Sequence, residues 1–201
     1  DASMFAAFAE SLPRLPLAAC LVLVSVGSAR ALDSAPYRSP QVVVASPDGR
    51  TLYAADRTAG CVTVLDTSSK VSPRDIPMPG EPAGLALSED GKQLFVAVRT
   101  GNLVAIVDTG TGQITRRIQA GTWPVDVALA PKAGRLVTAN RGDHSMRVLN
   151  LHSGKTLHRV PMVRDPARLA VTPDEKRCVV ANLLPKGAGT DPTLAATVSI
   201  V

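Results

Sequence analysis

Three arginines recur at a spacing of 42 residues, and each stands at the end of a short, mainly apolar run: Arg57, Arg99 and Arg141. Guanidinium groups repeated around one face of a fold can bind a carboxylate, a phosphate or an acidic protein surface, because their N–H donors match oxyanions in charge and geometry. The same side chains can instead pair with a neighbouring acid, or cover the strand below them with their stems. The sequence leaves both roles open, and Leu183 takes the fourth position of the series.

Trp123 and Arg164 extend this candidate site, since they fall close to the points where the repeating pattern restarts. We expect both on the rim that carries the three arginines, together with Glu81 and Asp165. Trp123 can pack against the next part of the chain or stack on a ligand, and both roles stay open. The predicted ligand-binding residues share this one rim, and none of them is predicted to be catalytic: Arg57, Arg99, Arg141, Trp123 and Arg164.

The histidines and cysteines form no metal or haem motif. The three histidines fall in one repeat, but in a rim loop, a turn on the opposite rim and an outer strand, so we expect them to lie apart: His144, His152 and His158. No Cys-x-x-Cys or Cys-x-x-Cys-His occurs. Cys61 and Cys178 lie in different repeats, which predicts two buried free thiols. We therefore predict no metal site and no cofactor in this stretch, and a haem only in a downstream domain.

The elements that position these side chains follow from the same period. Four prolines stand 42 residues apart, at Pro40, Pro82, Pro124 and Pro166. Each repeat holds four short apolar runs separated by turn signals, which is typical of a β-propeller blade. The sequence therefore predicts an all-β fold, a β-propeller of four-stranded blades of about 42 residues, with about 3.75 blades in this chain.

The second repeat shows the expected strands. Leu85–Leu87 follows the proline, and Asp90-Gly91 marks a hairpin turn because glycine accepts the positive φ that such a turn needs. The second and third strands are the apolar runs that begin at Leu94 and Leu103. Ile114–Ile118 alternates with polar residues, as an outer blade edge should. We expect blade boundaries near residues 81, 123 and 165, and no helix within the blades.

The fourth repeat departs from the period by an insertion of about ten residues after Asn182. The third-strand pattern returns at Val198–Val201, where the sequence stops inside a strand. A blade that ends there lacks its fourth strand and leaves an edge of unpaired backbone N–H and C=O groups. We therefore expect residues 32–201 to be the N-terminal part of a β-propeller, truncated inside its fourth blade, within a longer protein.

Residues 1–31 resemble a secretory signal peptide. Arg14 precedes the apolar run Leu15–Val26, and Ala29-Arg30-Ala31 fits a cleavage site, so the expected cut is after Ala31. This predicts a periplasmic or extracellular protein without a membrane span after cleavage. Two alternatives remain: a lipoprotein anchored through Cys20, which follows Leu17-Ala18-Ala19, and an uncleaved anchor.

Charge and composition narrow the partners. The net charge of +5 is dispersed, without a block of like charges, and aromatic residues make up only 3% of the chain. A basic arm and a set of stacking aromatics, which nucleic-acid binding uses, are both missing from this sequence. We expect a protein or a small anionic molecule as partner, and no nucleic acid.

Several segments resemble YVTN-type β-propeller repeats, a family of bacterial surface and secreted propellers. Leu52–Asp56, Leu136–Asn140 and Val179–Asn182 look like the Tyr-Val-Thr-Asn segment, and Ser-Pro-Asp-Gly and Val-x-Val-x-Asp-Thr match the surrounding repeat. The resemblance covers about residues 40–201. It implies a propeller related to lactonase-like propellers and to the haem d1 propeller of cytochrome cd1. Some larger relatives carry such a propeller ahead of cytochrome-c-like domains.

These observations favour a secreted or periplasmic propeller that acts as a binding or interaction scaffold, and they favour a non-enzymatic role over an enzymatic one for this stretch. One alternative is the propeller part of a c-type cytochrome or another redox enzyme whose haem domain lies downstream. The other is a lactonase-like hydrolase, which would need metal ligands that converge on the inner strands, where Asp126 is the one acidic residue in the expected runs.

Overall fold

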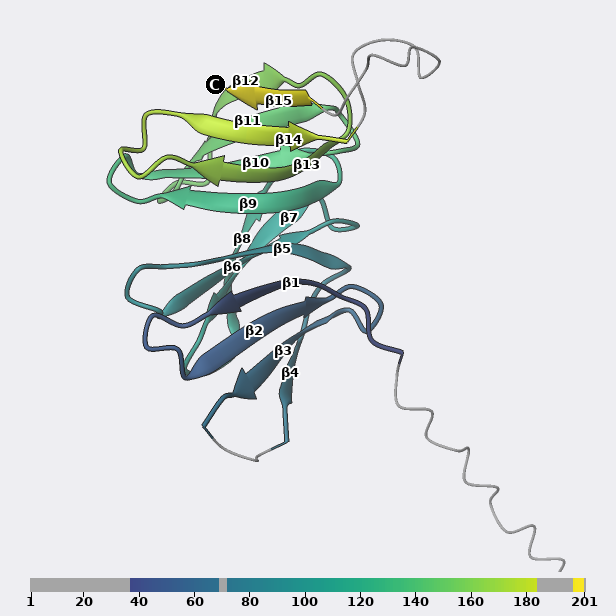
Figure 1. Cartoon of the computed structure of the whole chain (residues 1–201), viewed down its shortest axis with the longest axis vertical. Coiled ribbons are helices and arrows are strands. Elements are labelled where there is room, and N and C mark those ends of the chain that lie inside the picture. The colour runs from purple at the N-terminus through teal and green to yellow at the C-terminus, as the bar shows by residue number, and fades with distance from the viewer. Residues whose placement is uncertain (1–36, 69–71, 184–196, 201) are drawn as a thin grey trace, which may run out of the picture. The chain divides into compact units, whose positions relative to one another are not determined.

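The computed structural model describes residues 37–68, 72–183 and 197–200 (Figure 1). The described residues belong to one compact unit. The regular elements of the described residues are all β-strands, fifteen in number. The predicted signal peptide, residues 1–31, lies outside the described residues and stays a prediction.

The strands form four antiparallel sheets, each of which is one propeller blade in chain order. Blade 1 contains β1 (Pro40–Ala45), β2 (Thr51–Asp56), β3 (Cys61–Asp66) and β4 (Arg74–Pro77). Blade 2 contains β5 (Pro82–Leu87), β6 (Gln93–Val98), β7 (Leu103–Asp108) and β8 (Ile114–Gln119). Blade 3 contains β9 (Pro124–Ala130), β10 (Arg135–Asn140), β11 (Ser145–Asn150) and β12 (Thr156–Pro161). The described strands of blade 4 are β13 (Pro166–Val171), β14 (Cys178–Asn182) and β15 (Thr197–Ile200).

The prediction of an all-β propeller is confirmed, and the blades begin where the 42-residue period restarts. Each four-stranded sheet pairs its strands in sequence order, so every connection within a blade joins neighbouring strands. In blade 4, β15 pairs with β14 after the insertion, as the returning strand pattern indicated. Figure 1 shows the blades following one another from the purple first blade to the yellow-green fourth.

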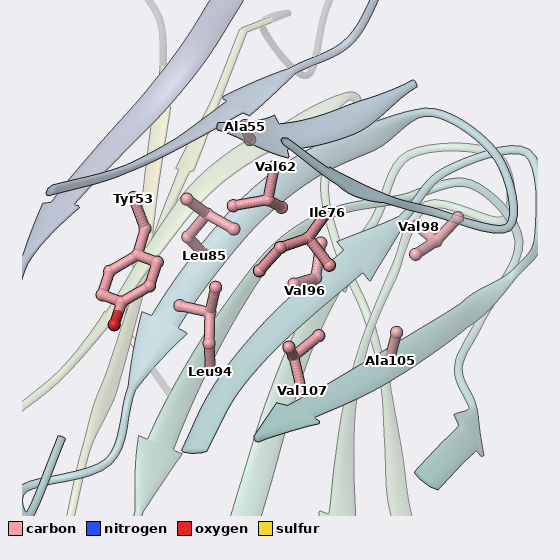
Figure 2. Packing of buried hydrophobic residues seen from close by; sticks show 10 residues of the cluster. All are labelled: Tyr53, Ala55, Val62, Ile76, Leu85, Leu94, Val96, Val98, Ala105 and Val107. Carbon is pink, nitrogen blue, oxygen red and sulfur yellow. The ribbon is translucent and has the colours of Figure 1, made fainter. Parts of the chain in front are cut away.

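Inner strands are buried on both faces, which explains their near-continuous apolar sequences. In β6, Leu94, Val96 and Val98 pack in a cluster with side chains of blade 1. The alternate residues Phe95 and Ala97 pack in a second cluster with side chains of blade 3. A strand places successive side chains on opposite faces, so a single strand supplies both clusters. Figure 2 shows the first cluster, where side chains of blades 1 and 2 meet.

Blades 3 and 4 meet in a third cluster. Val137, Met146 and Met162 of blade 3 and the following loop pack there against Cys178 and Val180 of blade 4. Valine and alanine therefore build much of this core, in place of aromatic rings. Each fully buried valine, leucine or methionine contributes about 1.5–3 kcal/mol relative to exposure.

A proline opens the first strand of every blade, and the residue after it is bulged. The ladder between first and second strands shifts register directly after Pro40, Pro82, Pro124 and Pro166. Proline has no N–H to donate, so ladder pairing is weakest at this point. A bulge leaves one residue unpaired and re-aims its side chain.

The asparagine that ends the second strand of blade 3 holds the rim of that blade together. Asn140 is fully buried; its Nδ2 donates to the carbonyl oxygens of Thr138 and Ser145, and its Oδ1 accepts the N–H of Gly121 at 3.1 Å. A side chain at Gly121 would overlap the carboxamide of Asn140. The last residue of the YVTN-like segment thus joins the blade's own strands to the loop that precedes the blade.

In blades 2 and 3, a glycine packs closely against a threonine at the same two repeat positions, but the two residue types are exchanged between the blades. In blade 2, a Cβ on Gly80 would lie 2.5 Å from Oγ1 of Thr100. In blade 3, 42 residues later, a Cβ on Gly142 would lie 2.7 Å from Cγ2 of Thr122. Gly80 and Thr122 hold equivalent positions, and so do Thr100 and Gly142. One partner of the contact is glycine in each blade, but not the same one.

The first strands of blades 2 and 3 approach each other closely at Gly84. A Cβ on this residue of β5 would lie 2.6 Å from Cα of Asp126 in β9 and 3.0 Å from the carbonyl oxygen of Val125. These are backbone atoms, which cannot rotate away. Glycine at position 84 therefore lets blades 2 and 3 approach each other.

We predict that Gly84→Ala destabilises the protein by about 1–3 kcal/mol, as expected for overpacking against backbone. Urea unfolding followed by circular dichroism measures the change. Gly110→Ala is the control, because its Cβ would lie 3.5 Å from the nearest atom, Oδ1 of Asp108, which is ordinary contact. Equal stability of Gly84→Ala and Gly110→Ala would contradict the prediction.

Candidate functional site

A pocket of about 290 Å3 lies where the first strands of all four blades begin. Its lining repeats with the 42-residue period. The four bulged residues supply one set of side chains: Gln41, Ala83, Val125 and Ala167. The loops between second and third strands supply the other set: Arg57, Arg99, Arg141 and Leu183. Arg168 completes the lining.

The three arginines therefore lie on one face and line one pocket, as their spacing indicates. We call Arg57, Arg99 and Arg141 the arginine rim. Their side chains are 44%, 21% and 32% exposed, respectively. The structure thus places them together and partly open to solvent. Their role in binding a ligand stays a prediction.

Each arginine of the rim connects its own blade to the next one. The residue directly before each opening proline, here called the junction residue, makes both contacts: Ser39, Glu81, Trp123 and Asp165. The backbone N–H of each arginine donates to the carbonyl oxygen of its own blade's junction residue, at 3.3, 2.7 and 2.9 Å for Arg57, Arg99 and Arg141. Each guanidinium contacts the junction residue of the following blade.

Two carboxylates serve the three guanidinium groups of the rim. Oε2 of Glu81 accepts from Nε of Arg57 at 3.1 Å and from Nη1 of Arg99 at 3.2 Å. Oδ1 of Asp165 lies 3.4 Å from Nε of Arg141. Most guanidinium N–H groups of the rim have no hydrogen bond to a described residue, and Nε of Arg99 and of Arg141 are buried without one. The rim thus keeps donor capacity beyond its own ion pairs.

Trp123 supplies an aromatic contact at the third junction. The guanidinium carbon of Arg99 lies 4.9 Å from the centroid of its ring, within cation–π distance. The indole is 46% exposed, so it packs on the rim without being buried by the next blade. Trp123 lies outside the pocket lining and joins the rim through this contact with Arg99. Arg164 is exposed and also lies outside the lining, so the pocket does not bring it together with the three arginines.

Asp126 and Arg168 form a second charged group beside the pocket. Asp126 is buried in β9, and its carboxylate accepts the N–H of Leu169 in β13 at 2.9 Å and that of Val127 at 3.0 Å. Nη1 of Arg168 lies 3.9 Å from the carboxylate, and Nη2 donates to the carbonyl oxygen of Gln41 in blade 1 at 3.1 Å. Burial raises the pKa of Asp126 above its ordinary value, while the two N–H donors and Arg168 oppose that rise.

Reasoning from the sequence missed the bulged residues and Arg168. The signal for the bulge was the proline itself, because a missing donor at the start of a strand favours irregular pairing. The partner of each guanidinium could also have been found, since each junction residue follows its arginine by 24 residues: Glu81 after Arg57, Trp123 after Arg99 and Asp165 after Arg141.

A second pocket of about 660 Å3 adjoins the rim between blades 1 and 2. Arg57 lines both pockets, and its ion-pair partner Glu81 lines the second, so the two pockets meet at Arg57. Apart from Met78, the other lining residues of the second pocket are small or polar, among them Ser39, Thr58 and Thr100. A ligand larger than the first pocket has room to extend in this direction.

His144 and the two described cysteines take part in hydrogen bonding or packing within the fold. Nδ1 of His144 accepts the N–H of the junction residue Asp165 at 3.2 Å. Cys61 and Cys178 are free and buried, as the sequence predicts, and burial raises the pKa of the Cys178 thiol to about 11. Among the described residues, no three side chains of His, Cys, Asp or Glu gather as a metal site would require.

The chain is similar in structure to hydrazine synthase from Kuenenia stuttgartiensis, with a TM-score of 0.69 and 21% sequence identity. The match covers 81% of this chain and 45% of that chain. No family model matches the sequence, and no curated protein matches it. The likeness shows the propeller fold, and the chain spans less than half the length of that protein.

Among the described residues, no helix is long and apolar enough to cross a membrane.

The pKa of Asp126 gives a pH-dependent prediction for Arg168→Ala. Because folding raises this pKa from 3.8, the ionised carboxylate costs stability, and the cost is absent at pH values below 3.8, where the group is protonated in both states. Removal of Arg168 raises the cost further wherever Asp126 is ionised. We expect Arg168→Ala to lower the melting temperature more at neutral pH than at acidic pH.

Thermal unfolding of the variant and the wild type across this pH range measures the difference. Arg177→Ala, which removes an exposed arginine of the same blade, is the control for net charge. A melting-temperature difference for Arg168→Ala that stays constant with pH would assign its effect to the Gln41 contact alone.

Proposed function

We propose that this chain is the propeller of an exported binding protein that holds an anionic ligand or an acidic partner on the arginine rim. One observation carries the proposal: arginines from three successive blades line a single pocket, and two carboxylates serve all three. Loops on a rigid scaffold are where propellers and other repeat folds commonly bind their partners.

The contacts of the rim allow this role beside a structural one. Exposed or partly exposed ion pairs contribute about 0–1 kcal/mol each, so three such pairs are not needed to hold the blades together. The apolar clusters between the blades already do so. A charge-assisted hydrogen bond to a ligand contributes about 1.5–3 kcal/mol, which favours recognition as the use of the remaining donors.

We also infer that the repeats are of the YVTN type. The segment Leu136–Asn140 supports this, because its last residue forms the buried hydrogen bonds of the blade-3 rim. Export would follow from the N-terminal segment, and the mature protein would act in the periplasm or outside the cell.

The two enzymatic alternatives have less support. A lactonase-like hydrolase would need metal ligands near the inner strands, whereas Asp126 is bound to backbone N–H groups and faces an arginine. A redox enzyme would need a haem domain beyond this sequence. The structural likeness to hydrazine synthase concerns the fold and does not choose between the roles.

The binding role predicts that Arg99→Ala weakens the binding of small anions and acidic peptides while changing stability by only about 1–2 kcal/mol. Isothermal titration with benzoate, citrate, inorganic phosphate and tetraglutamate, at low and physiological ionic strength, measures the affinity. Binding to the wild type should fall with added salt, because exposed charges are screened.

Arg117→Ala is the matched control, since it removes the same charge from the exposed strand β8. Equal losses in both variants would show that the anions sense only the net charge. Absence of binding to the wild type by every probe would overturn the proposed function.

Export makes a separate prediction. The mature protein should begin at Leu32, after removal of residues 1–31, and intact-mass analysis of the secreted or periplasmic product determines this directly. A lipid-modified chain that begins at Cys20 would support the lipoprotein alternative. An unprocessed protein that stays in the cytoplasm would contradict export.

A further inference from the structure

The junction residues of blades 2, 3 and 4 occupy one structural position with different chemistry. Glu81, Trp123 and Asp165 each precede an opening proline, and each receives the guanidinium of the preceding blade. Two of the three are carboxylates. At the middle junction an indole takes the place of the acid.

This replacement leaves positive charge at the centre of the rim. Arg99 has no acid at the junction it faces, and its one hydrogen-bonded carboxylate, Glu81, is already shared with Arg57. The ring of Trp123 lies against the guanidinium and shields it from water without neutralising it. An anion that reaches Arg99 therefore meets a partly desolvated cation whose charge is only partly compensated, by the shared Glu81, and charge-assisted hydrogen bonds are strong there.

The backbone at Trp123 shows that the indole is held in place at some cost. Its φ is +51°, a conformation that bulky side chains rarely adopt. The N–H of Trp123 donates to Oδ1 of Asn102 at 2.8 Å, which supports that conformation. Backbone strain of this kind clusters at functional sites, and here it lies in a partly exposed residue that contacts the arginine rim.

We propose that Trp123 is the specificity-determining residue of the arginine rim, and that it makes the pocket a site for a small organic monocarboxylate. By standing where the neighbouring blades hold an acid, it keeps Arg99 free to bind the carboxylate of the ligand. This inference rests on the proposed function and names its ligand class.

The charges of the pocket fit a single carboxylate. Arg168 adds a fourth guanidinium to the rim, and three carboxylates oppose the four: Glu81, Asp126 and Asp165. The surplus of one positive charge matches a monoanion better than a doubly charged phosphate. Planar carboxylates also suit the fork of N–H groups that a guanidinium presents.

The rest of the lining fits an apolar body on that carboxylate. Ala83, Val125 and Ala167 form a floor of small apolar side chains next to the arginines. The volume of about 290 Å3 is at the lower end for small-molecule pockets, which limits the ligand to a short chain or one ring. Benzoate is a suitable probe, because it joins one carboxylate to one flat apolar ring.

Blade 4 holds an aspartate, Asp165, at the position that Trp123 occupies in blade 3. Asp165 has φ of +52°, and its N–H is capped by His144 as that of Trp123 is capped by Asn102. Blade 4 thus shows that aspartate adopts this backbone and pairs with its arginine. Trp123→Asp should place the missing carboxylate on Arg99, and Trp123→Asn has the same shape without the charge.

Benzoate binding to the wild type, Trp123→Asp and Trp123→Asn is measured by isothermal titration, with acetate and inorganic phosphate as comparison ligands. The wild type should bind benzoate more tightly than acetate or phosphate. In Trp123→Asp we expect the dissociation constant for benzoate to rise at least about tenfold, as the loss of a charge-assisted hydrogen bond implies. Trp123→Asn should lose less than Trp123→Asp, since Arg99 keeps its charge. Near-UV circular dichroism and thermal unfolding check that both variants fold.

Removing an acid from the rim should have the opposite effect, an increase in benzoate affinity. Asp165→Asn removes the acid that faces Arg141 and leaves its backbone N–H to His144, so it should tighten benzoate binding. Equal affinities of Trp123→Asp and Trp123→Asn, or unchanged affinity in both, would overturn the role of Trp123 while anion binding by the rim stands. Tighter binding of phosphate than of benzoate by the wild type would overturn the ligand class. A wild type that binds no anion would instead refute the proposed function.

Discussion

The packing of one blade's face on the next is the constraint on which the structure depends. Leu94 and Val96 of β6 face one neighbour while Phe95 faces the other, so blade 2 buries its sheet only between blades 1 and 3. A single four-stranded sheet has no comparable way to cover two apolar faces. Because this contact is repeated with one period, each rim loop arrives at the same place in its blade. The shared pocket of the arginine rim is a consequence of that repetition.

The opening prolines connect this packing to the candidate site. Each proline removes a backbone donor at the start of a first strand, and the hydrogen-bond ladder has a bulge at the next residue. The bulged side chains, such as Val125, then line the pocket instead of alternating with the rest of the strand. A feature that reads as a simple strand start in the sequence therefore also shapes the binding surface.

Much of the fold could be predicted from the sequence, because the period acts on the backbone. The blade boundaries, the strand order and the shared face of Arg57, Arg99 and Arg141 all follow from equivalent backbone positions. Side-chain partners do not follow in the same way. That Glu81 serves two arginines, and that Arg168 reaches from blade 4 to blade 1, depends on side-chain direction across the blade contacts. Burial of the one acid in the first strands, Asp126, likewise required the close approach at Gly84.

The exchanged glycine and threonine of blades 2 and 3 bear on how such repeats diverge and can be redesigned. Gly80 with Thr100, and Thr122 with Gly142, are matched pairs, and in blades 2 and 3 each of the two repeat positions holds glycine in one blade and threonine in the other. A consensus sequence chosen column by column would be free to combine the two threonines and create a clash, or the two glycines and leave a gap. The two positions of such a pair can therefore be exchanged between these blades only together, and the pair, not the single residue, is what a redesign has to keep.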